Sequence, residues 1–242
     1  MKLLILFLFL VNSVIYAEDE VISPADLTQV KTFLWAQTGN KNSTLSGGFS
    51  GNLTSSMNYL ALIQYTRSYD RKEEQNDNLR FRLFGVDKVD FGVIDSIGIS
   101  IDYIDLDNTT ISNSNMVAYG AIFKIATGLK WLDIFPNIAY VTSKTQLKDG
   151  EEIKSDGYQL NIFASIYLDT LGKYLMVLPQ YTNTKYTQTK KMEFEYGQPL
   201  SNDMKWWFNT TLSYEEDSVN YNRVTENLDT IKTIKLGVIY YF

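Results

Sequence analysis

The stretch IGISIDY at residues 97–103 puts a large apolar or aromatic side chain at every odd position and a small or polar one at every even position. Successive side chains of a β-strand point to opposite faces, so this alternation predicts a strand with one apolar face. Residues 117–125 (VAYGAIFKI) and 158–166 (YQLNIFASI) repeat the pattern. Strands of soluble proteins usually have about five or six residues. A tilted strand that crosses a membrane needs about ten, which these runs approach.

The same alternation, followed back from the C-terminus, predicts about twelve strands, an even number, with ten and fourteen left open as alternatives. The fold class predicted is therefore all-β: a transmembrane, antiparallel, up-and-down β-barrel over residues 30–242. Eight strands are expected at residues 94–106, 115–127, 132–145, 155–168, 173–186, 188–198, 203–215 and 230–242, and four weaker ones at 30–40, 43–53, 56–67 and 77–86.

The segments between these strands predict which end of the barrel faces which compartment. Outer-membrane barrels have short turns in the periplasm and longer loops outside. With the last strand ending in the periplasm, the short turns are expected at Leu53–Ser56, Val86–Val93, Gly128–Trp131, Asp169–Gly172 and Gly197–Asp203. The longer, charged outer loops are expected at Ser68–Asn78, Asp105–Ser114, Ser143–Asp156 and Glu215–Asp229, with Thr184–Thr189 as a short exception.

The N-terminus has the order of a secretory signal peptide. Lys2 precedes a short run of Leu, Ile and Phe, and Ala17 precedes three acidic residues. This order predicts residues 1–17 as a signal peptide cleaved near Ala17. Residues 18–29 fit no strand, and Pro24 would suit the start of a helical turn. We interpret residues 18–29 as a short periplasmic lead-in, with a plug inside the barrel as the other interpretation.

The composition excludes several functional classes. The 242 residues include no His and no Cys, so neither a His-activated serine or water nor a disulfide can form. Loss of residues 1–17 removes Lys2 and leaves 21 basic against 28 acidic residues, which argues against nucleic-acid binding. We expect no cofactor and no catalytic or metal site. A lipid-active enzyme that works without histidine is retained only as a minor alternative.

The polar faces of the predicted strands supply the candidate functional residues. A charged side chain toward lipid costs about 2–4 kcal/mol near the midplane for Arg or Lys, so these faces should look into the barrel. The candidates carry both signs of charge, which predicts either a transverse field in a pore or ion pairs that close it. The expected lumen-facing residues are Arg80, Arg82, Asp102, Lys124, Asn161, Glu193, Glu195, Lys205, Asn209 and Lys235.

The last nine residues, 234–242 (IKLGVIYYF), alternate apolar side chains and end on an aromatic. This segment resembles the closing strand of bacterial outer-membrane β-barrel proteins. The resemblance implies that the barrel-assembly machinery reads Tyr240 and Phe242 during insertion. A narrower resemblance, to the poorly characterised salt-induced outer-membrane proteins, rests on Thr38-Gly39-Asn40, on Asp229-Thr230 and on Leu236-Gly237-Val238. It adds no chemistry.

These features together predict an exported protein of the outer membrane of a Gram-negative bacterium, in contact with lipid and lipopolysaccharide. Its expected function is that of a narrow, porin-like channel for small polar solutes, neutral or cationic. The alternative is a closed structural or surface-interaction barrel that acts through its charged outer loops. Acidic segments such as residues 149–152 could hold divalent cations between lipopolysaccharide molecules, although solvated loop tips explain them equally well.

Overall fold

The computed structural model describes residues 24–27, 29, 31–69, 77–108, 112–146, 152–221, 224–227 and 230–242. The expected signal peptide and most of the acidic loop segments lie outside these residues. Within the described ranges, no helix is long and apolar enough to cross a membrane.

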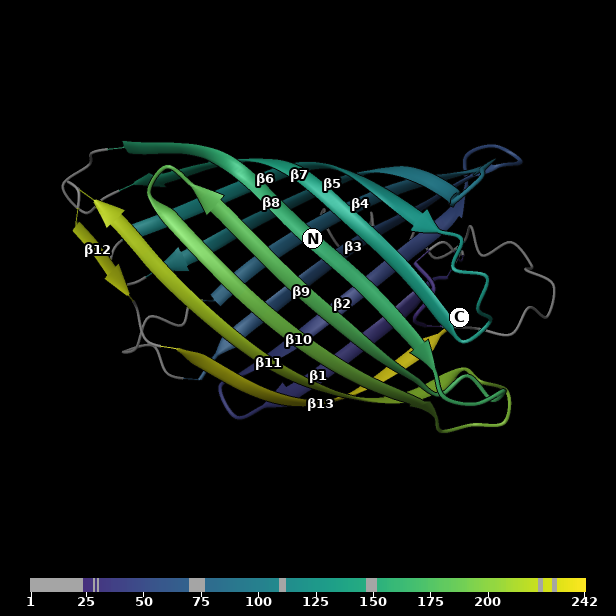
Figure 1. The fold of residues 1–242 in the computed structure, drawn as a ribbon. Coiled ribbons are helices and arrows are strands. Elements are labelled where there is room, and N and C mark those ends of the chain that lie inside the picture. Colours follow the sequence, from purple (N-terminus) through teal and green to yellow (C-terminus); the bar gives the residue numbers. More distant parts are fainter. Residues whose placement is uncertain are drawn as a thin grey trace, which may run out of the picture.

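The described residues form a closed, all-antiparallel β-barrel of twelve strands (Figure 1). Consecutive strands are neighbours, β1 pairs with β13, and the pairing of β10 with β11 closes the sheet. A thirteenth strand, β12 (Val224–Asn227), pairs with one end of β11 outside the ring of twelve. The barrel strands are β1 (Phe33–Gly39), β2 (Asn42–Asn52), β3 (Met57–Ser68), β4 (Asp77–Phe91), β5 (Ile94–Asn108), β6 (Ser112–Ile125), β7 (Leu132–Gln146), β8 (Glu152–Tyr167), β9 (Tyr174–Thr184), β10 (Thr187–Pro199), β11 (Trp206–Tyr221) and β13 (Ile231–Tyr241).

The barrel has two distinct ends. At one, here called the turn end, β1 begins and β13 reaches the C-terminus, and residues 53–56, 92–93, 126–131, 168–173 and 200–205 connect the strands. The other is called the loop end, and it carries β12. The C-terminus lies at the turn end, on the right of Figure 1.

All twelve predicted strands are present, but the predicted outer loops are shorter than expected. β5 extends to Asn108, β7 to Gln146 and β11 to Tyr221, so most of the segments expected as long loops are strand. The predicted turn at Val86–Val93 also shrinks, because β4 continues to Phe91. The prediction ended each strand where apolar alternation stopped, whereas main-chain hydrogen bonds between strands do not require apolar side chains.

The strands alternate an exposed apolar face with a buried polar one. Ile138 and Tyr140 on β7 are about half exposed, whereas Asn137 and Ala139 between them are buried. On β8, Leu160 and Ile162 are exposed, and Gln159 and Asn161 are buried. In a closed barrel the buried face points inward, so the interior is polar and the outer surface apolar.

An aromatic cluster fills the interior near the turn end. Tyr174 and Trp207 are almost fully buried, with ring centroids 6.0 Å apart, and Tyr241 packs with them. Gly197 makes room for this cluster, because a Cβ there would lie 2.2 Å from the Tyr174 ring. Ala25, from the segment before β1, belongs to the same cluster and is fully buried.

Candidate functional site in the barrel interior

Charged side chains from several strands meet in the interior. Four of them, on β4, β5 and β10, form two ion pairs. Arg80 on β4 donates from Nε to Asp102 Oδ1 on β5 at 2.8 Å, and its Nη2 contacts the second carboxylate oxygen. Arg80 and Asp102 are close because Arg82, two residues along the same face, is the direct register partner of Asp102. On β10, Lys191 Nζ lies 3.1 Å from Glu193 Oε2. Both pairs are less than one third exposed, so each charge has its counter-ion within the wall.

Two other charged groups have polar neighbours only. Arg82 donates from Nη2 to Gln64 Oε1 at 3.3 Å, and its Nε is buried without a hydrogen-bond partner. Glu195 is 9% exposed and accepts a hydrogen bond of 2.7 Å from the Tyr174 hydroxyl. Neither group takes part in an ion pair with another described residue. Asp102, Glu193 and Glu195 nevertheless act electrostatically on Arg82, and Arg82 acts on Glu195.

Asn209 lies beside the register partner of Glu195 and is fully buried. Its Oδ1 accepts a hydrogen bond of 3.1 Å from Trp35 Nε1, while its Nδ2 has no partner. Lys235 on β13 donates to Thr44 Oγ1 at 3.1 Å. A hydroxyl therefore binds the Lys235 ammonium, and the buried Asn209 side chain acts on the neighbouring Glu195.

A chain of neutral groups lies on β5, β7 and β8. Asn161 Nδ2 donates to Asn137 Oδ1 at 2.9 Å, and Asn137 Nδ2 donates to Ser100 Oγ at 3.0 Å. Asn161 keeps a buried oxygen without a partner. Buried polar atoms without a partner are rare in proteins unless water or a ligand meets them.

The charged strands face one another across the barrel. In the closed order, five strands separate β4 from β10 in either direction, so these two strands are on opposite walls. Glu193 and Glu215 act electrostatically on Arg80, and Glu193 and Glu195 act on Arg82. The interior therefore carries arginines on one wall and a cluster of carboxylates opposite them.

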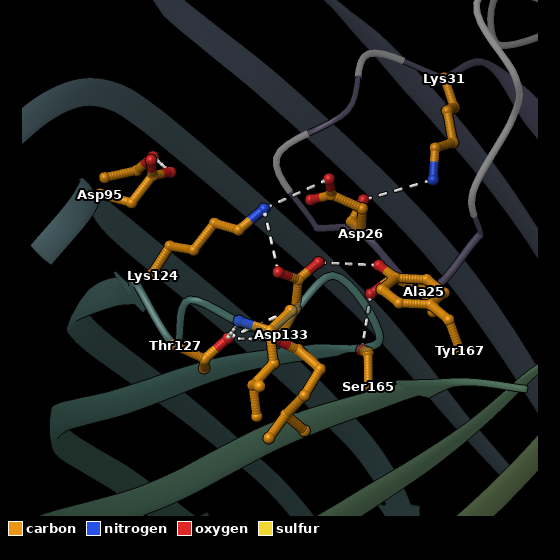
Figure 2. A network of polar contacts seen from close by, with 12 residues as sticks. Ala25, Asp26, Lys31, Asp95, Lys124, Thr127, Asp133, Ser165 and Tyr167 are labelled. Atoms are coloured by element: carbon orange, nitrogen blue, oxygen red, sulfur yellow. Dashed lines mark hydrogen bonds and ion pairs between the residues drawn. The ribbon is translucent and has the colours of Figure 1, made fainter.

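The segment before β1 occupies the interior at the turn end (Figure 2). Ser165 Oγ on β8 donates to the Ala25 carbonyl at 2.7 Å. Lys124 Nζ on β6 lies 3.4 Å from Asp26 Oδ2 and 3.4 Å from Asp133 Oδ1 on β7. Through these contacts Ala25 and Asp26 meet inward-facing side chains of β6 and β8 at the turn end.

Two further contacts secure the segment. Asp133 Oδ2 accepts a hydrogen bond of 2.8 Å from the Tyr167 hydroxyl, so Asp133 is itself held in place. Lys31 Nζ donates to the Asp26 carbonyl at 3.3 Å. The pKa of Lys31 is lowered to about 7, mainly by burial; Asp26 opposes this shift and the neighbouring Lys124 adds to it. Leu27 borders two small cavities of about 10 Å³ each, between the segment and the wall.

The interior contains all but one of the ten expected lumen-facing residues. Lys205 lies in the connection ahead of β11, its side chain is exposed, and it contributes a carbonyl that accepts from Tyr241 N at 2.9 Å. It is not part of the interior cluster. The predicted strand began at residue 203, three residues before β11, because nothing in the sequence distinguishes Lys205 from a strand position.

Several partners in this interior were not found from the sequence. One of the two carboxylates that contact Lys124 belongs to Asp26, which is 98 residues earlier in the chain. Lys191 and Thr211 were not proposed, although they alternate in phase with Glu193 and Asn209. Strict extension of the inward phase along β10 and β11 would have found both.

Tyr240 and Phe242 lie away from the interior. Phe242 is 56% exposed, and its ring meets that of Tyr240 edge to face at 5.0 Å. Tyr240 also packs on Trp206, with centroids 4.7 Å apart. These rings form part of an exposed aromatic surface at the turn end.

Comparison with known proteins identifies the fold class only. No family model and no curated protein matches the chain. Among solved structures, an outer membrane channel from Pseudomonas putida F1 has a TM-score of 0.62 at 10% identity, over 91% of this chain and 100% of that one. The translocator domain of the autotransporter NalP from Neisseria meningitidis has a TM-score of 0.54 at 13% identity, over 90% and 91%. The KdgM porin has a TM-score of 0.52 at 8% identity, over 88% and 99%.

The fold is that of outer-membrane β-barrels. The general resemblance read from the C-terminal strand is confirmed at the level of fold, and the structural neighbours are channels and porins. The narrower resemblance to the salt-induced family is not confirmed. At these identities the comparisons carry no information on a solute.

Proposed function

We propose that this protein is an outer-membrane channel for small polar solutes, neutral or cationic, with a narrow interior. The observation that carries the proposal is the polar inner face, which extends from Ser155 near the loop end through Asn161 to Ser165 near the turn end on β8. The likeness of the fold to channels and porins supports it.

The arrangement in the membrane follows from the same proposal. Residues 1–17 act as a signal peptide, the turn end faces the periplasm, and the apolar outer face contacts lipid and lipopolysaccharide. Insertion by the barrel-assembly machinery would use Tyr240 and Phe242 as part of its signal. No enzymatic role is proposed. Among the described residues, no group of three or more Asp or Glu side chains could hold a metal ion.

The route of a solute through the barrel is narrow at two levels. Near the middle, Arg80 and Arg82 face Glu193 and Glu195, so a passing solute meets both signs of charge at once. At the turn end, the segment that contains Ala25 and Asp26 fills part of the cross-section. Both features favour low conductance and selection by charge and size over a wide diffusion pore.

A second candidate function is a closed barrel that acts through its loop end. The position of the segment before β1 favours the closed barrel, because its contacts with Ser165 and Lys124 place this segment inside the barrel. In this case the ion pairs near the middle of the barrel would stabilise the wall, and no solute would pass through the interior.

Planar-bilayer recording separates the two candidates. The mature chain is refolded in detergent, its folding is checked by heat-modifiable migration, and its current is compared with that of a variant lacking residues 18–29. Small, reproducible current steps that increase in the truncated variant are expected for the channel. A folded barrel that conducts in neither form would overturn the channel proposal and favour the closed barrel.

A further inference from the structure

Arg82 is a partly buried cation that forms no ion pair with a described residue, although Asp102 is its register partner. Its contact with Gln64 Oε1 is 3.3 Å long, and its Nε has no partner. Arg80, two residues away on the same face, is neutralised by Asp102. A guanidinium binds carboxylates with two parallel hydrogen bonds, so the free side of Arg82 suits a carboxylate.

Glu195 is the matching anion. It is 9% exposed, and the Tyr174 hydroxyl, which carries no charge, binds it at 2.7 Å. Glu193, two residues away, is neutralised by Lys191 at 3.1 Å. A buried carboxylate is stable as an anion only when a cation or several donors compensate it, so Glu195 suits an ammonium group.

These two groups face each other. Arg82 is on β4 and Glu195 on β10, which lie on opposite walls of the closed barrel. Each acts electrostatically on the other, although no direct contact joins them. Four of the neighbouring charged groups are paired as Arg80 with Asp102 and Lys191 with Glu193, and Lys235 binds the Thr44 hydroxyl. A carboxylate held by Arg82 and an ammonium held by Glu195 would give each of these two groups a counter-ion in contact.

We propose that the middle of the barrel is a binding site for small zwitterions that carry both a carboxylate and a primary ammonium group, such as free amino acids. The carboxylate binds Arg82 and the ammonium binds Glu195. This inference rests on the proposed function as a channel, and it names the class of solute.

The test measures binding at equilibrium, and therefore does not require transport. Isothermal titration of the refolded barrel uses three probes of similar size: alanine, alaninamide, which keeps only the cation, and N-acetylalanine, which keeps only the anion. The wild type should bind alanine at least tenfold more tightly than either analogue. Equal affinity for all three probes, or no binding, would overturn the site.

Single substitutions then assign each end of the solute. Arg82→Gln should remove the preference for alanine over alaninamide and leave the preference over N-acetylalanine. Glu195→Gln should do the reverse. The double variant Glu152→Gln/Lys154→Gln is the matched control, because it removes an exposed ion pair without changing the net charge, and it should bind alanine like the wild type. Loss of binding in this control, or identical effects of the two single variants, would contradict the assignment.

Conductance keeps this inference separate from the proposed function. A barrel that binds alanine but passes no current would overturn the channel and leave the site standing. A barrel that conducts but does not discriminate the three probes would overturn the site and leave the channel standing. Trp35, which donates to Asn209 at 3.1 Å, gives an independent fluorescence signal for occupancy.

Discussion

Lys124 Nζ lies 3.4 Å from Asp26 Oδ2, and this contact joins the wall of the barrel to the segment that precedes it. Lys124 also lies 3.4 Å from Asp133, so one ammonium bridges two carboxylates (Figure 2). Because all three side chains are less than about one fifth exposed, the ammonium offsets a repulsion that water would screen only weakly.

Replacement of Lys124 by Met should release the segment from the barrel. The two carboxylates would then repel each other, and loss of a partly buried ion pair of about 2 kcal/mol shifts the docking equilibrium roughly thirtyfold. Single-channel conductance should increase, and protease added to the refolded barrel should cut within residues 18–31 more rapidly. Lys130→Met removes an exposed lysine from the adjoining turn and is the control. Unchanged cleavage in Lys124→Met would show that other contacts hold the segment.

Docking of the same segment should strengthen as the pH increases from about 7 to 10.5. Burial lowers the pKa of Lys31 to about 7 from its ordinary value of 10.5, so across this window the docked lysine binds fewer protons than the released one. Release of a proton on docking favours the docked state at higher pH, and Lys31 contributes no slope below pH 7. Protease sensitivity of the segment should therefore decrease over this window. Lys31→Met should remove that slope, and a slope that persists would assign it to another group.

The fold could be predicted further than the site. Two-residue alternation, as at residues 97–103, located all twelve barrel strands, because the membrane requires one apolar face along each strand. It also put Arg80 and Asp102 on the same face. It could not show that Arg80 pairs with Asp102 while Arg82 does not, since that depends on side-chain reach between two strands.

Contacts between distant parts of the chain could not be predicted from the sequence. Asp26 belongs to a segment without periodicity, and nothing in its neighbourhood indicates that Lys124, 98 residues later, is its partner. The ends of the strands could not be predicted either, because polar residues such as Asp107 and Asn108 pair with the neighbouring strand as well as apolar residues do. Periodicity reports which face a side chain takes, and tertiary contacts decide what it meets there.

Loss of one partner from the Arg80–Asp102 pair should destabilise the barrel more than loss of both. Arg80→Gln leaves the Asp102 carboxylate without its cation, at a cost of about 3 kcal/mol, and adding Asp102→Asn should restore most of it. Urea unfolding in detergent, followed by tryptophan fluorescence, measures the difference. Lys154→Gln breaks an exposed pair with Glu152 and should cost less than about 0.5 kcal/mol. Equal costs for the single and double variants would contradict a paired role.

Phe242 should matter for insertion more than for the stability of the folded barrel. Its ring is 56% exposed and meets the ring of Tyr240 edge to face, while its main-chain N–H donates to the Thr32 carbonyl, a bond that an alanine would keep. Phe242→Ala should therefore lower the amount of folded protein in the outer membrane, while the purified, refolded barrel unfolds at nearly the wild-type urea concentration. Leu212→Ala, at a similarly exposed position on β11, should leave the yield unchanged. Equal yields for both variants would show that Phe242 is not part of the assembly signal.

Gly172 should be less replaceable than Gly92, although both lie in turns at the turn end with positive φ. Any residue with a Cβ is strained in that backbone conformation by about 1–2 kcal/mol, so Gly92→Ala, which meets open space, should lose about that much stability. At Gly172 a Cβ would also lie 3.0 Å from Cη2 of Trp207 and 3.1 Å from Cε of Met204. Trp207 cannot retreat easily, because it is fully buried and its Nε1 donates to the Met204 carbonyl at 2.6 Å. Gly172→Ala should therefore unfold at a lower urea concentration than Gly92→Ala, and equal midpoints would mean that the Trp207 cluster yields to the added methyl group.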